Sequence, residues 1–327
     1  MKKEAILQVN GIYKSFGVVK ALKDVSISFL PGEIHGLIGE NGSGKSTLSS
    51  IISGIYSCNQ GEMILDGKVY KPTSIMDGEK HGICMIVQEM GTIGGITVAA
   101  NVFAGKEELF SRLGIVNRKA MNRAAQEALD KIGASYIKAE NKIDEESFEN
   151  RKIVEIARAM FNDVKVLIID ETTTALSQKG RELIYQIMDR LKDENKVVIF
   201  ISHDLDELTE HCNTVTVLRD GVYIKTLHGE EIQPDVMRQL MIGREVQDNY
   251  YRDDYDDYRG GEDVITVENV CTEGGLKNVS FALKKGEILG IGGLTDSGMH
   301  DLGRTVFGVE KCEKGSVYLS SSSEKMQ

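Results

Sequence analysis

The sequence predicts an α/β fold built on a mostly parallel β-sheet. Three observations lead to this prediction. Four short segments are apolar throughout, which is typical of strands buried on both faces of a sheet. Segments with helical periodicity alternate with these apolar runs. A glycine-rich stretch directly follows the first apolar segment and precedes a helical one, which is the order of a strand, a loop and a helix in such folds.

The four predicted strands occupy residues 34–38, 83–87, 164–169 and 197–201. A helix is predicted over residues 118–132, because Asn117 can cap its start and Gly133 can end it. One face of this helix is apolar and carries Met121, Ala125, Ala128 and Ile132. The sequence therefore predicts a parallel core with a helical insertion.

Composition narrows the possible partners. The formal net charge is -11, with 39 Lys and Arg against 50 Asp and Glu, so nucleic acid is not expected as the main partner. The start MKKEAILQVN lacks the apolar core of a signal peptide, and nowhere do eighteen apolar residues run together. We therefore expect any membrane role to come through a partner. The five cysteines show no CxxC spacing and are expected to be reduced thiols of a cytosolic protein rather than zinc ligands.

An internal repeat organises the chain. Residues 22–48 recur without a gap at residues 276–302, and the match continues from Gly54 over Gly308 to Leu65 over Leu319. The sequence thus predicts one whole module over residues 1–247 and the opening of a second over residues 264–327. The stretch between them, residues 248–263, is dense in like charges and is predicted to be an acidic linker. We expect a truncated tandem protein.

The glycine-rich stretch GENGSGKS at residues 39–46 fits the pattern GxxxxGK[ST]. Glycines let backbone N–H groups close around phosphate oxygens, and the following helix N-terminus adds positive potential. Lys45 is predicted to bind the β- and γ-phosphates of a nucleotide, and the Ser46 hydroxyl to bind Mg²⁺. The full predicted nucleotide-binding set in this loop is Gly39, Asn41, Gly42, Ser43, Gly44, Lys45, Ser46 and Thr47.

Polar residues follow the other predicted strands. Asp170 ends the third strand, where its carboxylate can help to hold Mg²⁺, and Glu171 can polarise an attacking water as general base. His203 follows the fourth strand and can contact the γ-phosphate and orient that water. Gln88 follows the second strand and is placed to sense the γ-phosphate and Mg²⁺, although the residues alone do not separate this role from a structural one.

In order and spacing, these motifs resemble the ATP-binding subunits of ABC transporters. The resemblance rests on the segments KSFGVVKALKDVS, GENGSGKSTL, SGIYSCNQGEMILDGK, VQEM, ANVFAGKE, VEIARAM, IIDET and ISHDLDEL. The stretch KKGEILGIGGL is typical of how the second cassette opens in fused two-cassette subunits of bacterial importers for ribose, galactose, xylose and related monosaccharides. The resemblance implies the P-loop NTPase fold of an ABC cassette: a RecA-like sheet, an antiparallel β subdomain and a helical subdomain, followed by a partial second cassette. It also implies that Phe16 stacks on adenine and that Thr174, Ala175 and Leu176 form the D-loop.

The same resemblance implies a function. The cofactors would be ATP and Mg²⁺, and ATP hydrolysis would energise import of a monosaccharide. The subunit would lie on the cytoplasmic face of the cell membrane against integral membrane permease subunits, and would depend indirectly on an extracytoplasmic solute-binding protein. A second cassette or a second copy would complete each ATP site. Alternatives are a nucleoside or signalling-sugar importer of the same architecture, a non-transport ABC ATPase acting on ribosomes or DNA, and a decayed cassette that only binds.

Three departures from the family pattern bear on activity. Residues 146–150 read ESFEN where the family has LSxGQ, so Glu149 replaces a glycine and brings like charge toward a phosphate, while Ser147 is expected to cap a helix. Met299 and His300 stand in the second copy where Lys45 and Ser46 stand in the first. Because cassettes pack head to tail in this family, both defects are expected in one composite site. Thr172 replaces a proline, for which we expect a modest effect. We therefore expect a chain that binds MgATP and hydrolyses it slowly.

Overall fold

A computed structural model describes residues 4–87, 89–112, 114–161, 163–243, 261–293, 297–320 and 325–326. The chain divides into two compact units, Met1–Val246 and Gln247–Gln327. Each unit is described by itself.

The first unit is organised around a six-stranded sheet in the order β12-β11-β3-β10-β9-β6. Its strands are β3 (Glu33–Ile38), β6 (Ile83–Ile86), β9 (Val166–Asp170), β10 (Val197–Ile201), β11 (Thr214–Arg219) and β12 (Val222–His228). All neighbouring pairs are parallel except β11 and β12 at one edge. Each of the four apolar segments predicted as strands is confirmed, and the mostly parallel sheet is confirmed with them.

A second, antiparallel sheet of the first unit has the order β2-β1-β4-β5. Its strands are β1 (Leu7–Phe16), β2 (Val19–Phe29), β4 (Gln60–Leu65) and β5 (Lys68–Tyr70). Successive residues of a strand point to opposite faces, and the buried strands of the parallel sheet therefore feed two cores. Ile168 and Ile199 pack with this antiparallel sheet, whereas Leu167 and Phe200 pack on the other face with helices.

The helices follow patterns that the sequence sets. They are α1 (Lys45–Ile52), α2 (Ile75–Lys80), α3 (Val98–Val102), α4 (Arg118–Lys131), α5 (Phe148–Met160), α6 (Gln178–Asp193), α7 (Leu205–His211) and α8 (Pro234–Ile242). Helix α4 begins after Asn117, whose side chain accepts a hydrogen bond from the Ala120 N–H, and the chain leaves it through Gly133 at φ 83°. The predicted helix and its cap are confirmed.

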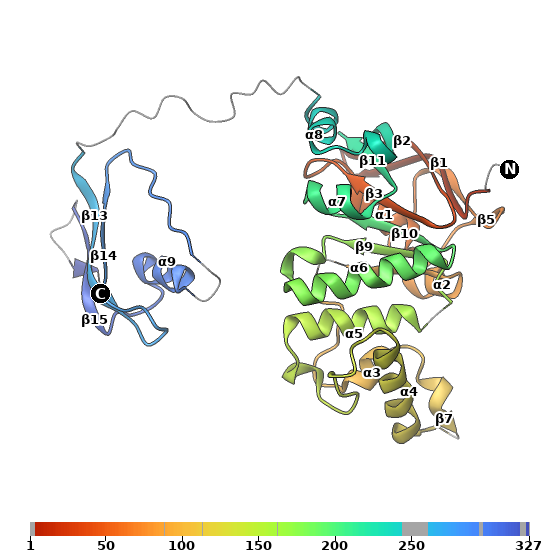
Figure 1. Cartoon of the computed structure of the whole chain (residues 1–327), viewed down its shortest axis with the longest axis horizontal. Helices are drawn as coiled ribbons and strands as arrows, with labels where there is room; N and C mark the ends of the chain where they lie inside the picture. Colours follow the sequence, from red (N-terminus) through yellow and green to blue (C-terminus); the bar gives the residue numbers. More distant parts are fainter. Residues whose placement is uncertain are drawn as a thin grey trace. The chain divides into compact units, whose positions relative to one another are not determined.

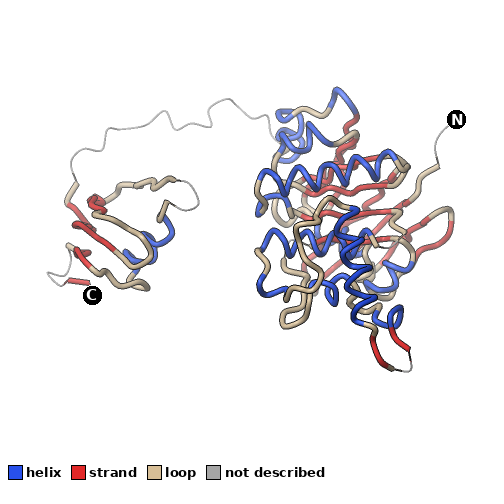
Figure 2. The backbone as a smooth tube through the Cα atoms, turned by 60° about the horizontal axis from the view of Figure 1, so that its bottom comes forward, coloured by secondary structure: helices blue, strands red, loops and turns tan. Residues whose placement is uncertain are grey.

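Helices α3, α4 and α5 pack on one another and lie at the end of the first unit away from β1 and β2 (Figure 1). The two-stranded hairpin of β7 (Ser111–Arg112) and β8 (Ile115–Val116) projects from this helical part (Figure 2). Among the described residues, none of the helices combines the length and the apolar character that crossing a bilayer requires.

The second unit repeats the opening of the first. Its sheet has the order β14-β13-β15-β16, with β13 (Asp263–Cys271), β14 (Val279–Lys284), β15 (Lys314–Leu319) and β16 (Lys325–Met326), and its helix is α9 (Met299–Phe307). One difference separates the copies. Residues 287–292 correspond to β3 but belong to no strand, and Ile288 is 91% exposed where Ile34 of the first copy is 1% exposed. In the first unit β10 and β11 flank β3, and the described part of the second unit holds no counterpart of either.

Candidate phosphate-binding site

The carboxyl ends of β3, β9 and β10 bring most of the predicted site residues to one edge of the parallel sheet. Strand β10 pairs with β3 on one side and with β9 on the other, and Ile201 is the partner of both Leu37 and Asp170. The loop of residues 39–44, the carboxylates of Asp170 and Glu171, and the His203 imidazole follow these three strand ends. Ligands bind at such carboxyl edges in open α/β sheets.

Glycine is required in the loop for two separate reasons. Gly42 and Gly44 have φ values of 82° and 101°, in the left-handed region that side chains disfavour. A Cβ on Gly39 would lie 2.1 Å from the Leu218 carbonyl oxygen, so the backbone passes too close for any side chain. The following helix α1 has Gly44 at its N-cap and no side-chain cap, so its first N–H groups are left to a ligand.

Lys45 is buried, with 4% of its surface exposed, at the first position of α1. Its ammonium donates hydrogen bonds to the carbonyl oxygens of Gly39, at 2.8 Å, and Glu40, at 3.1 Å. Burial lowers the pKa of Lys45, while the charges of Glu171 and Asp170 act in the opposite direction. The side chain therefore lies across the loop with its cation close to the carboxylate pair.

One buried carboxylate oxygen of Asp170 is unsatisfied among the described residues. Burial, followed by the charge of Glu171, raises its pKa to about 6, and a hydrogen bond from the Ser46 side chain acts against that shift. Its Oδ1 is buried and has no hydrogen-bond partner among the residues that the structure describes, which is costly unless a ligand satisfies it. A carboxylate oxygen beside a serine hydroxyl is a donor set that suits Mg²⁺, so these residues fit the predicted metal.

Glu171 and His203 form a close pair. His203 Nε2 lies 2.6 Å from Glu171 Oε1, with the carboxylate side chain 12% exposed and the imidazole side chain 42% exposed. Glu171 has a φ of 46°, which a residue with a side chain rarely adopts, and its N–H donates to the Ile201 carbonyl oxygen at 3.0 Å. Such strain is found where the surrounding structure fixes a functional side chain.

Two further site residues were predicted, Gln88 and Phe16. Gln88 is outside the described residues. Phe16, at the end of β1, is 43% exposed and packs edge to face against Tyr56 at 5.2 Å between ring centroids, with the Lys14 ammonium 5.1 Å from the Phe16 ring centre. Sequence reasoning did not find Tyr56, because only the fold brings the turn after α1 against the end of β1.

The side chain of Glu149 binds within its own unit. Its carboxylate accepts hydrogen bonds from the backbone N–H of Ser177, at 2.9 Å, and from the Ser177 hydroxyl, at 3.0 Å. These bonds tie the first turn of α5 to the start of α6. The predicted helix cap at Ser147 is confirmed, since its hydroxyl accepts from the Asn150 N–H. The effect of Glu149 on a phosphate stays a prediction.

Thr172, where a proline was expected, is buried, and its hydroxyl donates to the Asp170 carbonyl oxygen at 3.1 Å. This bond supplies some of the local constraint that a proline ring would give.

The described ends of the corresponding loop in the second unit keep the geometry of the first, without its lysine. Helix α9 begins at Met299 after Gly298 at φ 83°, as α1 begins at Lys45 after Gly44. A Cβ on Gly293 would lie 2.2 Å from Ser297 Oγ, and a Cβ on Gly39 would lie 2.4 Å from Ser43 Oγ. Both ends of the loop therefore keep their backbone geometry. Met299 stands where Lys45 stands in the first copy, and His300 stands where Ser46 stands.

The raised pKa of Asp170 predicts an unusual pH dependence of stability. The folded state favours the protonated acid of Asp170. The stability that this carboxyl group contributes is therefore fully present below its unfolded pKa, near 4, and is lost as the pH rises through its folded pKa of about 6. We expect Asp170→Asn to be more stable than the unchanged chain by about 3 kcal/mol at about pH 7.5, and by much less at about pH 4.5. Urea unfolding without nucleotide or Mg²⁺ measures the difference; a gap that does not vary with pH would contradict this expectation.

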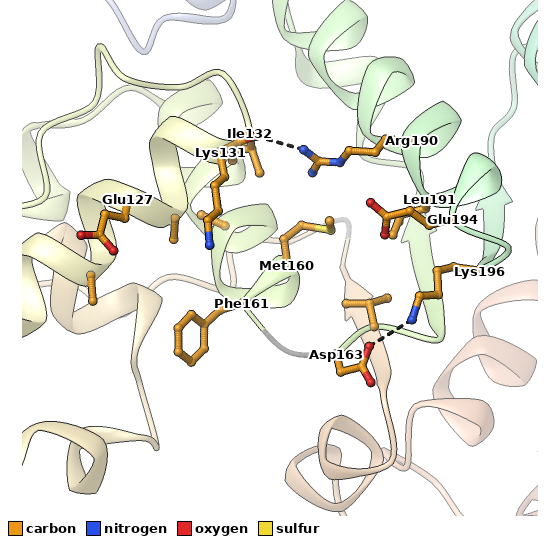
Figure 3. Close-up of a pocket in the computed structure, with 14 residues that line it drawn as sticks. Glu127, Lys131, Ile132, Met160, Phe161, Asp163, Arg190, Leu191, Glu194 and Lys196 are labelled. Atoms are coloured by element: carbon orange, nitrogen blue, oxygen red, sulfur yellow. Dashed lines mark hydrogen bonds and ion pairs between the residues drawn. The ribbon is translucent and has the colours of Figure 1, made fainter.

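A separate pocket of about 420 Å³ lies between α4, α5 and α6 (Figure 3). Its charged groups are partly paired: Arg190 donates to the Lys131 carbonyl oxygen at 2.9 Å, and Lys196 meets Asp163 at 3.0 Å. Of the predicted site residues that the structure describes, none lines it.

A glycine loop between β3 and α1, a carboxylate pair that closes β9 and a histidine after β10 define a P-loop NTPase of the ATP-binding cassette type. The family model described as ABC transporter matches residues 22–174. That part of the chain belongs to the ABC transporter family.

Similarity to curated relatives extends along almost the whole chain. The chain is 34% identical, over 99% of its length, to the ribose import ATP-binding protein RbsA of Caldanaerobacter subterraneus subsp. tengcongensis. It is 37% identical, over 95% of its length, to the ribose import ATP-binding protein RbsA 1 of Rubrobacter xylanophilus. The chain spans 64% and 61% of those two relatives.

Solved structures confirm the fold class. An ATP-binding cassette of an ABC transporter in its ADP conformation has a TM-score of 0.63 and 26% identity, covering 74% of this chain and all of that one. A dimeric bacterial ABC transporter cassette, at 23% identity and a TM-score of 0.58, shows the same fold over 68% of this chain and 98% of its own.

Proposed function

We propose that this chain is an ATP-binding and ATP-hydrolysing subunit that energises import of a monosaccharide. The observation that carries the proposal is the gathering of Lys45, Asp170, Glu171 and His203 at one sheet edge, above a glycine loop and an open helix N-terminus. The choice of sugar transport rests on the names of the relatives, which are ribose import proteins.

The residues divide the chemistry between them. Backbone N–H groups of residues 39–47 and the Lys45 ammonium hold the β- and γ-phosphates. Ser46 and Asp170, with Gln88, would hold Mg²⁺, which supplies charge neutralisation of the triphosphate when bound. Glu171 polarises the attacking water, and His203 keeps that carboxylate oriented through the 2.6 Å contact and faces the γ-phosphate. Phe16 stacks on the adenine.

The proposed transport function implies an assembly with other subunits. Permease subunits in the membrane would receive the motion of the cassette from the cytoplasmic face, and a solute-binding protein outside would deliver the sugar to them. A second cassette or a second copy would face the phosphate loop and close the ATP site. The second unit, over residues 264–327, would be the opening of a degenerate cassette, and residues 248–263 the linker to it.

ATP hydrolysis is the direct test of the proposal. We expect slow release of phosphate that needs Mg²⁺, because ESFEN is a poor substitute for the family signature. Glu171→Gln removes the base and is expected to lower the rate by about 10²-fold or more while nucleotide still binds. Equal rates in the two proteins would refute the assignment of Glu171. Co-purification of a polytopic permease with the tagged chain tests the transport role, and association with ribosomes would favour the non-transport alternative.

A further inference from the structure

Glu207 is a buried carboxylate that the proposed mechanism does not use. It lies in the first turn of α7 and is 8% exposed. Three hydroxyl groups from three other segments donate to it. Ser202 Oγ and Thr173 Oγ1 both donate to Oε2, at 2.5 and 2.9 Å, and Tyr185 OH donates to Oε1 at 2.6 Å.

Two of these donors flank the Glu171–His203 pair. Ser202 directly precedes His203, and Thr173 lies two residues after Glu171. The paired ladder of β9 and β10 ends at Asp170 and Ile201, so both catalytic side chains lie beyond the last pair of the sheet. Ser202 and Thr173 are 0% and 1% exposed, and each reaches the same carboxylate oxygen. Past the end of the ladder, that oxygen joins the two chain segments.

We infer that Glu207 is a positioning residue, which holds the segments of Glu171 and His203 at the separation that their contact requires. This inference rests on the proposed ATPase function. Tyr185 serves as an internal reference, because its hydroxyl binds the other oxygen and comes from α6 rather than from the segment of either Glu171 or His203. A role in general stability would depend on all three bonds, whereas positioning depends on the two that reach Oε2.

Four variants and one control separate these roles. Glu207→Ala removes every acceptor, and Thr173→Val removes one flanking bond while conserving shape. Glu207→Gln keeps an oxygen for Ser202 and Thr173, and its amide can donate to the Tyr185 hydroxyl. This variant should therefore keep the hydrolysis rate that Glu207→Ala loses. Tyr185→Phe removes only the bond to Oε1. Glu210→Gln is the matched control, since Glu210 lies on the same helix with its side chain 78% exposed.

Single-turnover hydrolysis with enzyme in excess and titration with a fluorescent ATP analogue give the readouts. We expect Glu207→Ala to lower the rate at least about tenfold with affinity within about twofold, since misplacing catalytic groups costs rate rather than ground-state binding. Thr173→Val should give a smaller loss. Glu207→Gln, Tyr185→Phe and Glu210→Gln should keep the rate. An undiminished rate in Glu207→Ala, or an equal loss in Tyr185→Phe, would overturn the inference.

A third readout separates this inference from the proposed function. If the unchanged chain binds nucleotide but does not hydrolyse it, the proposed activity fails, and the His203 ring signals in a histidine-labelled NMR spectrum decide the positioning role. His203→Gln assigns those signals. They should move in Glu207→Ala and stay in Tyr185→Phe and Glu210→Gln; signals that do not move in Glu207→Ala would overturn the inference.

Discussion

Lys45→Ala is expected to weaken nucleotide binding by about 100-fold or more. Lys45 is 4% exposed, and its ammonium donates two hydrogen bonds to loop carbonyl oxygens, so the side chain is largely desolvated and lies across the glycine loop. A charge-assisted hydrogen bond from such a group contributes about 3 kcal/mol, and each 1.4 kcal/mol is about tenfold in affinity. Titration with a fluorescent adenine nucleotide measures the change.

The internal repeat supplies a matched control for this experiment. Met299 occupies the same first position of α9 that Lys45 occupies in α1. Met299→Ala should leave the titration unchanged, because the second loop has no phosphate cation to lose. Circular dichroism checks that both variants fold. Saturable binding that is indifferent to replacement of Lys45 would remove the basis of the proposed function.

Lys152→Met is expected to lower the free energy of unfolding by about 3 kcal/mol or more. Lys152 is fully buried on α5, and its ammonium meets Glu155 at 3.2 Å, the Val87 carbonyl oxygen at 2.8 Å and the Glu89 carbonyl oxygen. Glu155 in turn accepts from the Gly91 N–H at 2.7 Å. Removing the cation leaves a buried carboxylate and two carbonyl oxygens without their donor, which costs far more than an exposed pair.

A surface pair with the same spacing provides the comparison. Lys192 meets Asp189 at 2.7 Å, also three residues apart in a helix, with side chains 32% and 54% exposed. Lys192→Met should cost less than about 1 kcal/mol. Chemical unfolding of both variants, and of Lys152→Met combined with Glu155→Leu, tests the explanation. The double variant should recover part of the loss, because it removes the stranded charge. Equal losses at the two lysines would contradict it.

Much of the site could be predicted because its chemistry is local in sequence. The spacing of glycines around Lys45 and the placement of Asp170 and His203 after apolar runs required no tertiary information. Parallel strands bring their carboxyl ends to one edge, and these motifs therefore had to converge. The helix caps at Asn117 and Ser147 could also be predicted, since each contact spans only three residues.

The contacts that could not be predicted join residues that are distant in sequence. The effect of Glu149 on a phosphate stays a prediction, but its contact with Ser177, the N-cap of α6, is not indicated by anything in ESFEN. No spacing in the sequence indicates that Lys152 and Glu155 bind the backbone on both sides of Gln88. The repeat predicted the form of the second unit but not the exposure of Ile288.

The sequence by itself determined the class of protein, because a phosphate loop is a property of consecutive backbone groups and each strand carries its own apolar pattern. It also determined which residues we propose to face the phosphate. Only the tertiary structure decided how Glu171 and His203 are held, and which groups bind the carboxylates of Glu149, Glu155 and Glu207. Hydrogen bonds between elements depend on distances that packing sets after the chain has folded, and no residue spacing encodes them.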